Sequence, residues 1–145
     1  MTLQVVVLAA GLGIAGATAG VARTQSSDPA LVGSWRVVGG EFAGKPLPSS
    51  QAPKVTLAFE PGGRWRDTDG SEATWKADPS ASPKTLDLTY TAGRDTGTTQ
   101  LCVYELKADR LSIAFGIPGG KDRPGAVSTT AGNQRVILLI LERSK

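Results

Sequence analysis

The sequence predicts an all-β fold, a small antiparallel up-and-down barrel of about eight strands. Short segments in which apolar and polar residues alternate recur along the chain, and turn-forming glycines and prolines separate them. After residue 30, no window keeps the 3.6-residue apolar period of a helix over three turns. Closure into a barrel removes the exposed edges that so many strands would otherwise have to protect, and an open sandwich is the structural alternative.

The first expected strand begins near Leu31, where the domain itself is expected to start. Leu31, Gly33, Trp35 and Val37 alternate with other residues and therefore share one face of this strand. The stretch 44–48 contains two prolines, which lack a backbone donor. It therefore cannot continue a central strand.

The later strands are identified by the same alternation and by the turns between them. Asp69-Gly70 suits the positive backbone angles of a tight hairpin turn, which would place Trp65 and Trp75 on neighbouring strands. The last strand is expected to be covered on both faces, because its core, 136–141, is entirely apolar. The strands after the first are expected at residues 55–60, 64–68, 72–77, 86–90, 100–106, 111–115 and 135–142.

Size and composition limit the class of protein. At 145 residues and 15.0 kDa the chain fits one domain, expected to span 31–143. The net charge is +3 and the basic residues are scattered, so we expect no nucleic-acid partner. The chain has no histidine and a single cysteine, Cys102, which argues against a structural zinc site, a histidine base and an internal disulfide. Within an apolar strand, Cys102 is expected to be a small buried hydrophobe.

The beginning of the sequence predicts export. Residues 3–19 carry no charge and end in the small-x-small pattern Ala17–Ala19, which signal peptidases accept. We expect a signal peptide at 1–19, a flexible leader at 20–30 and a periplasmic or extracellular protein. Since no basic residue precedes the apolar run, an uncleaved membrane anchor is the alternative. The G-x-G-x-x-G pattern at 11–16 lacks the strand and helix context of a dinucleotide site, so no cofactor is expected.

Several pieces of the domain carry a family resemblance through their order and spacing: residues 31–35, 44–48, 83–89, 104–106 with Leu111, and 123–124. Together they resemble the lipocalin-like family of uncharacterised domains that is abundant in Planctomycetes bacteria. The resemblance implies a lipocalin-like barrel that binds cargo, with Gly33 and Trp35 in a structural plug at its closed end. It also implies an arginine over the tryptophan, for which Arg135 and Arg143 are both candidates. The family pattern has an aromatic residue where this chain has Val127, which leaves the role of the last loop open.

Two parts of the chain are candidates for binding. Five aromatic residues are expected on the inner face of the barrel, where they either line a ligand cavity or fill the core: Phe59, Trp65, Trp75, Tyr90 and Phe115. The long polar segment 116–133, with Lys121 and Arg123 near its middle, is either a lid over the open mouth or a solvated excursion. We therefore expect a hydrophobic or amphipathic small molecule to bind at the open end. The alternative is a filled barrel that acts as a protein-interaction or inhibitor module through the segment 116–133.

Two sequence patterns suggest a calcium site and a hydrolase site, but neither pattern is complete. Residues 67–72 look like part of a calcium loop, but the loop register would place Trp65 and Lys76 at ligand positions, so a hairpin turn is the better interpretation. Asp87 and Glu105 lie on strands that would be adjacent in a meander, yet nothing fixes them across a cleft. We interpret them as solvent-facing charges and expect neither an enzyme nor a metal site.

Overall fold

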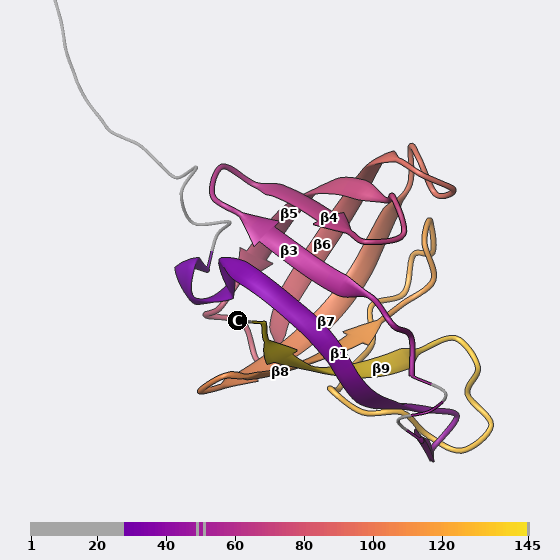
Figure 1. Ribbon diagram of the computed structural model, residues 1–145. Coiled ribbons are helices and arrows are strands. Elements are labelled where there is room, and N and C mark those ends of the chain that lie inside the picture. The colour runs from indigo at the N-terminus through magenta and orange to yellow at the C-terminus, as the bar shows by residue number, and fades with distance from the viewer. Residues whose placement is uncertain (1–27, 49, 51, 145) are drawn as a thin grey trace, which may run out of the picture.

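The computed structural model describes residues 28–144 except residues 49 and 51. An antiparallel sheet of nine strands closes on itself, so that eight strands form a barrel and one short strand is added at an edge (Figure 1). This confirms the predicted all-β barrel. The elements are, in chain order, a 3-10 helix η2 (Pro29–Leu31) and the strands β1 (Gly33–Phe42), β2 (Lys45–Leu47), β3 (Thr56–Glu60), β4 (Arg64–Asp67), β5 (Glu72–Asp78), β6 (Lys84–Ala92), β7 (Thr99–Lys107), β8 (Arg110–Phe115) and β9 (Ile137–Arg143).

Each barrel strand pairs with the next one along the chain, and the last strand returns to the first. The pairing of β1 with β9 runs the length of both strands, from Trp35 opposite Arg143 to Phe42 opposite Ile137. A bulge in the middle of β1 interrupts the register and bends this long strand. Because β9 pairs with both β8 and β1, the sheet is sealed into a barrel.

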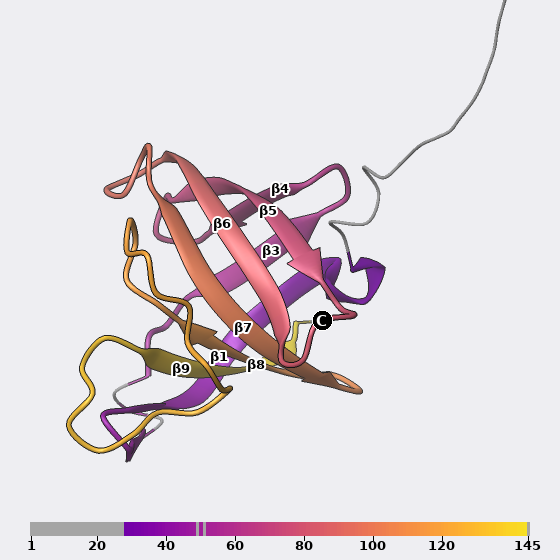
Figure 2. The same ribbon diagram turned by 180° about the vertical axis from the view of Figure 1, so that it is seen from behind.

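The two ends of the barrel differ in what they carry. One end, called the closed end below, has η2, the end of β9 and the short turns 61–63, 79–83 and 108–109. The other end, the open end, has the connections 43–55, 68–71, 93–98 and 116–136. Figures 1 and 2 show η2 and the C-terminal end of β9 together at the closed end.

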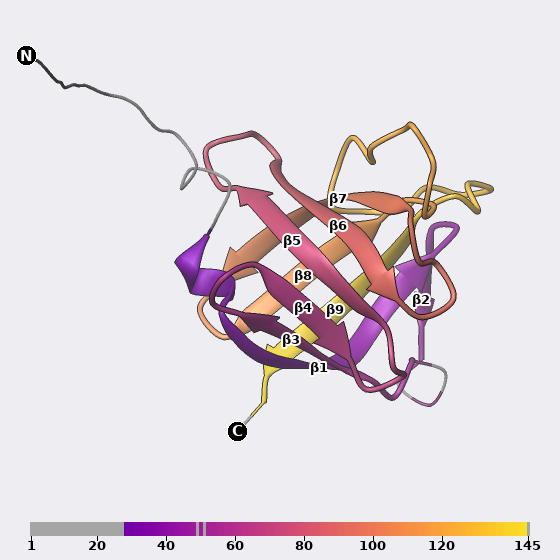
Figure 3. The same ribbon diagram turned by 90° about the horizontal axis from the view of Figure 1, so that it is seen from above.

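The ninth strand, β2, is a short edge strand beside the far end of β1 (Figure 3). Its three residues pair with Gly40, Glu41 and Phe42. The sequence predicts no central strand at 44–48, and β2 agrees with this because Pro46 lies at an edge, where its missing N–H breaks no ladder. The proline also keeps this edge from recruiting a further strand.

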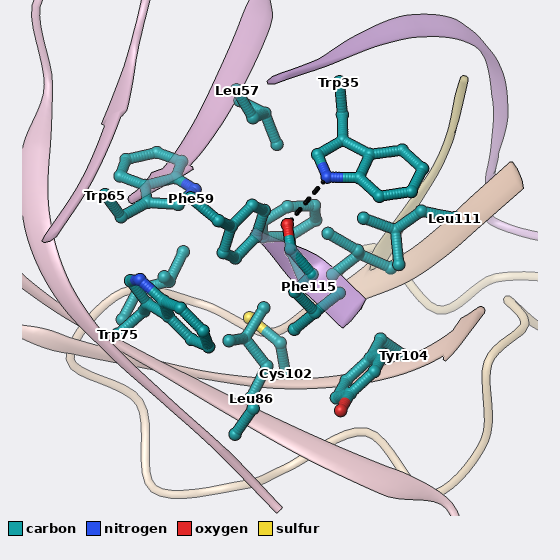
Figure 4. Close-up of a cluster of buried hydrophobic side chains, with 14 of the residues drawn as sticks. Trp35, Leu57, Phe59, Trp65, Trp75, Leu86, Cys102, Tyr104, Leu111 and Phe115 are labelled. Atoms are coloured by element: carbon teal, nitrogen blue, oxygen red, sulfur yellow. Dashed lines mark hydrogen bonds between the residues drawn. The ribbon is translucent and has the colours of Figure 1, made fainter. Parts of the chain in front are cut away.

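Inward-facing side chains at every second strand position fill the barrel (Figure 4). The five aromatic residues expected on the inner face all lie there and are between 1% and 8% exposed: Phe59, Trp65, Trp75, Tyr90 and Phe115. Phe59 packs edge-on against Trp75 with ring centroids 5.4 Å apart, and Trp65 packs edge-on against Tyr90 at 5.8 Å. Each such pair contributes about 0.5–1.5 kcal/mol beyond its burial. These residues therefore form core in this conformation.

Trp35 plugs the closed end. It is fully buried, and its indole N–H donates to the carbonyl oxygen of Leu31 at 2.9 Å. The guanidinium of Arg143 lies 4.2 Å from the centre of the Trp35 ring and donates to two carbonyl oxygens of the η2 segment, at 3.1 and 3.2 Å. Of the two candidate arginines, Arg143 is thus the one that covers the tryptophan. Leu31 belongs to η2 and not to the first strand, so the expected strand start was two residues early.

Gly33 makes room for this arrangement. Its φ of +136° is a conformation that residues with a side chain rarely adopt. A Cβ atom at this position would lie 2.7 Å from Nη1 of Arg143. The glycine is therefore required by both the backbone turn into β1 and the close approach of the arginine.

Asp28, the first residue that the structure describes, already contacts the barrel ahead of Leu31, where the domain is expected to start. The Asp28 side chain is 7% exposed; one carboxylate oxygen accepts from the N–H of Ala30 and the other from the hydroxyl of Tyr104, at 3.1 and 2.7 Å. The N-terminal cap of η2 is thus tied to the barrel interior. The predicted signal peptide 1–19, and the leader up to residue 27, lie outside the described residues.

Candidate functional site

The connection 116–136, called the strap below, lies along the outer wall of the barrel. It leaves the open end after β8, passes over the outer faces of β7 and β8, and returns to β9 (Figure 2). It is therefore neither a lid over the mouth nor a solvated excursion, the two alternatives that the sequence leaves open. The polar composition of the strap does not predict this course, because only a few of its side chains hold the whole segment against the barrel.

Arg123 is the first of these anchors. Its guanidinium lies 2.7 Å from Oδ1 of Asp87 on β6 and donates to the carbonyl oxygen of Cys102 on β7 at 2.9 Å. The side chains of Arg123 and Asp87 are only 30% and 35% exposed. Arg123 is thus committed to holding the strap, whereas Lys121, the other loop residue expected to bind, is exposed and has no ion-pair partner among the described residues.

The strap also covers a second apolar cluster on the outside of the barrel. Val103, Ala114 and Leu138 point outward from β7, β8 and β9, yet they are at most 5% exposed. Val127 and Val136 of the strap pack against them. Val127 therefore helps to cover this outer cluster. Because the strap covers the outer face of β9, this last strand is apolar on both faces, as the sequence predicts.

The returning half of the strap docks on the turn between β1 and β2. The hydroxyl of Thr129 accepts from the backbone N–H of Gly44 at 2.9 Å and donates to the carboxylate of Glu41 at 3.1 Å. Gly44 has a φ of +81°, and a Cβ atom there would lie 2.7 Å from the backbone nitrogen of Ala131. The strap is therefore fixed at both of its halves.

A pocket of about 410 Å³, the strap pocket, opens between the two halves of the strap. It is lined by Ile117, Gly120, Asp122, Arg123, Pro124, Gly125, Ala126, Ser128, Thr130, Asn133, Arg135 and Val136. Ile117 is 43% exposed and is one of two large hydrophobic residues that the described part of the chain leaves in solvent. The exposed charged groups of Asp122 and Arg135 have no ion-pair partner among the described residues.

The strap pocket combines an apolar wall with unused polar groups, which is the usual composition of a small-molecule site. Sequence reasoning missed Ile117 and Arg135 as binding candidates. The available signal was the isoleucine at 117, since the other apolar residues of the segment are valines, prolines and alanines.

Besides the polar groups at the closed end, a pair of hydrogen-bonded side chains is buried toward the open end of the barrel. The hydroxyl of Tyr90 donates to the side chain of Gln100, which in turn donates to the carbonyl oxygen of Gly116 at 2.7 Å. The indole nitrogen of Trp65 is buried without a hydrogen-bond partner among the described residues. Burial raises the pKa of Tyr90 well above its usual value, so the phenol stays protonated. Three pockets outside the barrel, of about 410, 680 and 810 Å³, are lined by none of the five aromatic residues expected to line a cavity.

The two carboxylates considered for a hydrolase do not meet. Asp87 lies opposite Leu101 in the β6–β7 register and pairs with Arg123, whereas Glu105 is four residues farther along β7. Glu105 is exposed and lies 3.8 Å from the ammonium of Lys107. The arrangement of paired acids across a cleft is therefore not formed.

Cys102 lies in the core of the barrel. The Cys102 side chain is fully buried, and this burial raises the pKa of its thiol far above the usual range, so it is not a nucleophile in the folded protein. Within the described residues there is no group of three or more side chains that could hold a metal ion. The same part of the chain contains no helix with the length and apolarity needed to cross a membrane.

The comparisons with known proteins add no functional assignment. The chain matches no protein-family model. It likewise matches no curated protein and no solved structure.

Proposed function

We propose that this chain is an exported binding protein that takes a hydrophobic or amphipathic small molecule in the strap pocket, on the outside of the barrel beside its open end. The observation that carries the proposal is the make-up of this pocket. Ile117 is exposed in it beside Pro124 and Val136, and the guanidinium of Arg135 is left without an ionic partner among the described residues. The apolar wall would bury the body of the ligand, and Arg135 would hold a polar or anionic head.

The interior of the barrel is a less suitable binding site than the strap pocket. A molecule placed there would have to displace aromatic side chains that are nearly fully buried and stacked edge-on in pairs. The strap pocket, at about 410 Å³, lies within the range of roughly 300–1,000 Å³ typical of small-molecule sites and needs no such repacking. We therefore place the ligand outside the barrel wall, although the family resemblance implies cargo inside it.

Native mass spectrometry of the purified protein after incubation with a lipid extract tests the proposal. We expect a bound mass on the unmodified protein and its loss in Ile117→Asp, which puts a charge on the apolar wall of the pocket. Phe42→Asp is the matched control, because Phe42 is similarly exposed, 37% against 43%, but lies at the end of β1 and does not line the strap pocket. Loss in Phe42→Asp alone would place the ligand in the barrel mouth. An unmodified protein without any bound mass would contradict the proposal altogether.

A filled barrel that binds a protein partner through the strap is the second candidate. The observation that favours it is the fixation of the strap by Arg123 and Thr129, which presents Lys121 on a rigid surface. Removing the strap would uncover the outer apolar cluster, so a point substitution is the better test. Lys121→Glu should abolish crosslinking to a partner in the native host while leaving the melting temperature and small-molecule binding unchanged.

Export rests on the sequence of residues 3–19, which is uncharged and ends in a small-x-small pattern. Sequencing the N-terminus of the protein recovered from the periplasm or medium tests it. A mature chain beginning at Gly20 is expected. A chain that keeps Met1 and fractionates with the membrane would support the uncleaved anchor instead.

A further inference from the structure

A second concave site lies at the closed end, on the opposite end of the barrel from the strap pocket. It has a volume of about 810 Å³ and is lined by Arg36, Lys107, Ala108, Asp109, Arg110, Glu142, Arg143 and Ser144. Four of these side chains are basic and two are acidic, and Glu105, just outside the lining, lies 3.8 Å from Lys107, which leaves a surplus of one positive charge. This site is called the arginine groove below.

A row of three charged residues forms the wall of the arginine groove. Arg36, Glu142 and Arg110 lie directly opposite one another on β1, β9 and β8. One carboxylate serves both arginines, because Oε1 of Glu142 lies 3.4 Å from Arg36 and Oε2 lies 2.8 Å from Arg110. The two arginine side chains are 57% and 59% exposed, so each keeps N–H donors that face solvent.

Arg143 supplies charge to the groove, but three of its five N–H donors are already used. Its Nη atoms donate to carbonyl oxygens of the η2 segment, its Nε lies 3.3 Å from Asp109, and its plane stacks on Trp35. These contacts fix it as part of the floor. The donors most open to a ligand therefore belong to Arg36 and Arg110, and the ammonium of Lys107, which lies 3.8 Å from Glu105, is beside them.

A second cluster of charged residues, on the opposite wall of the barrel, has no surplus of positive charge. There, Arg64 and Arg66 are matched by two acids, Glu60 and Glu72, with Arg64 2.9 Å from Glu72 and Arg66 2.9 Å from Glu60. The exposed fractions of these arginines, 56% and 53%, are close to those in the groove. The two clusters differ in charge balance.

We propose that the arginine groove binds a doubly charged phosphate group, such as inorganic phosphate or a phosphomonoester. A planar guanidinium offers two parallel N–H donors that match two oxygens of a phosphate. A phosphomonoester carries a charge of about −1.5 to −2 near neutral pH, which offsets the positive surplus of the groove. The site is independent of the ligand proposed for the strap pocket.

Titration of the purified full-length chain with inorganic phosphate at constant ionic strength, followed by amide NMR shifts, tests the site. We expect saturable shifts at residues 107–110 and 142–144 and none in the strap. The double variant Arg36→Gln/Arg110→Gln should weaken phosphate binding at least tenfold. The control Arg64→Gln/Arg66→Gln removes two arginines of similar exposure and should change binding less than twofold. Equal weakening in both double variants would show unspecific attraction by net charge and would overturn the proposal.

The source of the phosphate is distinguished by a second arm with vesicles. Vesicles of phosphatidylcholine with phosphatidic acid are compared with vesicles of phosphatidylcholine alone, in a sedimentation assay with the same variants. Sedimentation that requires phosphatidic acid and falls at least tenfold in Arg36→Gln/Arg110→Gln assigns the groove to a lipid headgroup. Binding of inorganic phosphate without such sedimentation assigns it to a soluble compound. The absence of both overturns the site.

Discussion

Replacing Arg123 by methionine should free the middle of the strap from the barrel wall and lower the free energy of unfolding by about 2 kcal/mol. The substitution keeps an apolar stem of similar length and removes the charge. It breaks the ion pair with Asp87 and the hydrogen bond to the carbonyl oxygen of Cys102. The outer apolar cluster beneath the strap should then become accessible to solvent.

The magnitude follows from the exposure of the two partners. Exposed ion pairs contribute at most about 1 kcal/mol, whereas breaking a buried one costs about 3–5 kcal/mol. With side chains 30% and 35% exposed, Arg123 and Asp87 are still screened by solvent, and we take the upper end of the exposed range, about 1 kcal/mol, for the pair. The hydrogen bond to Cys102, at 2.9 Å, adds about 1 kcal/mol. For a domain of this size, the sum lowers the melting temperature by roughly 8 °C.

Urea unfolding followed by circular dichroism measures the loss, and binding of a hydrophobic dye to the native state reports the uncovered cluster. A double-mutant cycle with Asp87→Asn should give a coupling energy of about 1 kcal/mol. Arg64→Met is the control, since Arg64 is 56% exposed and pairs with Glu72 at a similar distance. Its effect should stay below about 0.5 kcal/mol. A loss in Arg123→Met no larger than in this control would refute the reasoning.

Three further predictions concern the core. Trp35→Phe should cost about 2 kcal/mol in thermal unfolding, since the carbonyl oxygen that accepts from the indole is left unpaired; a change below about 0.5 kcal/mol would contradict this role. The folded protein should show no phenolate absorbance at 295 nm near pH 10, because burial raises the pKa of both tyrosines, Tyr90 and Tyr104. Since their folded pKa exceeds the unfolded one, their stabilising contribution is complete below about pH 10 and is lost at higher pH. Cys102 should react with a thiol reagent at pH 8 only as fast as the protein unfolds; rapid stoichiometric reaction of the native protein would show the thiol to be accessible.

The sequence predicts the barrel well because strand alternation is a local property. The inner and outer faces of β5 can be assigned from Trp75 and its neighbours alone, since every second residue returns to the same face. The start of the domain is harder to predict from the sequence. Leu31 continues the apolar alternation of β1, and only the cap by Asp28 and the contact with Tyr104 turn this segment into a 3-10 helix.

The candidate site depends on contacts that local patterns cannot reveal. The inward direction of the aromatic residues follows from alternation, whereas the space left between them depends on how the rings pack. The partner of Arg123 is Asp87, 36 positions earlier, and no spacing rule connects the two. The same holds for the plug, because the choice of Arg143 over Arg135 is set by the register in which β9 meets β1. Long-range register, not local propensity, decides where the strap and its pocket lie.

The pairing of β1 with β9 has a consequence for how the chain acquires its structure. Arg36 and Glu142, which face each other across this pairing, are 106 positions apart in the chain. Bringing such distant strands together costs loop-closure entropy before any contact repays it, which makes barrels of this kind slow to fold. A nascent chain that still lacks β9 exposes two open strand edges, one on β1 and one on β8. The pairing of β9 with β1 and β8 is therefore the folding step that covers both edges, and until then the chain can aggregate through them.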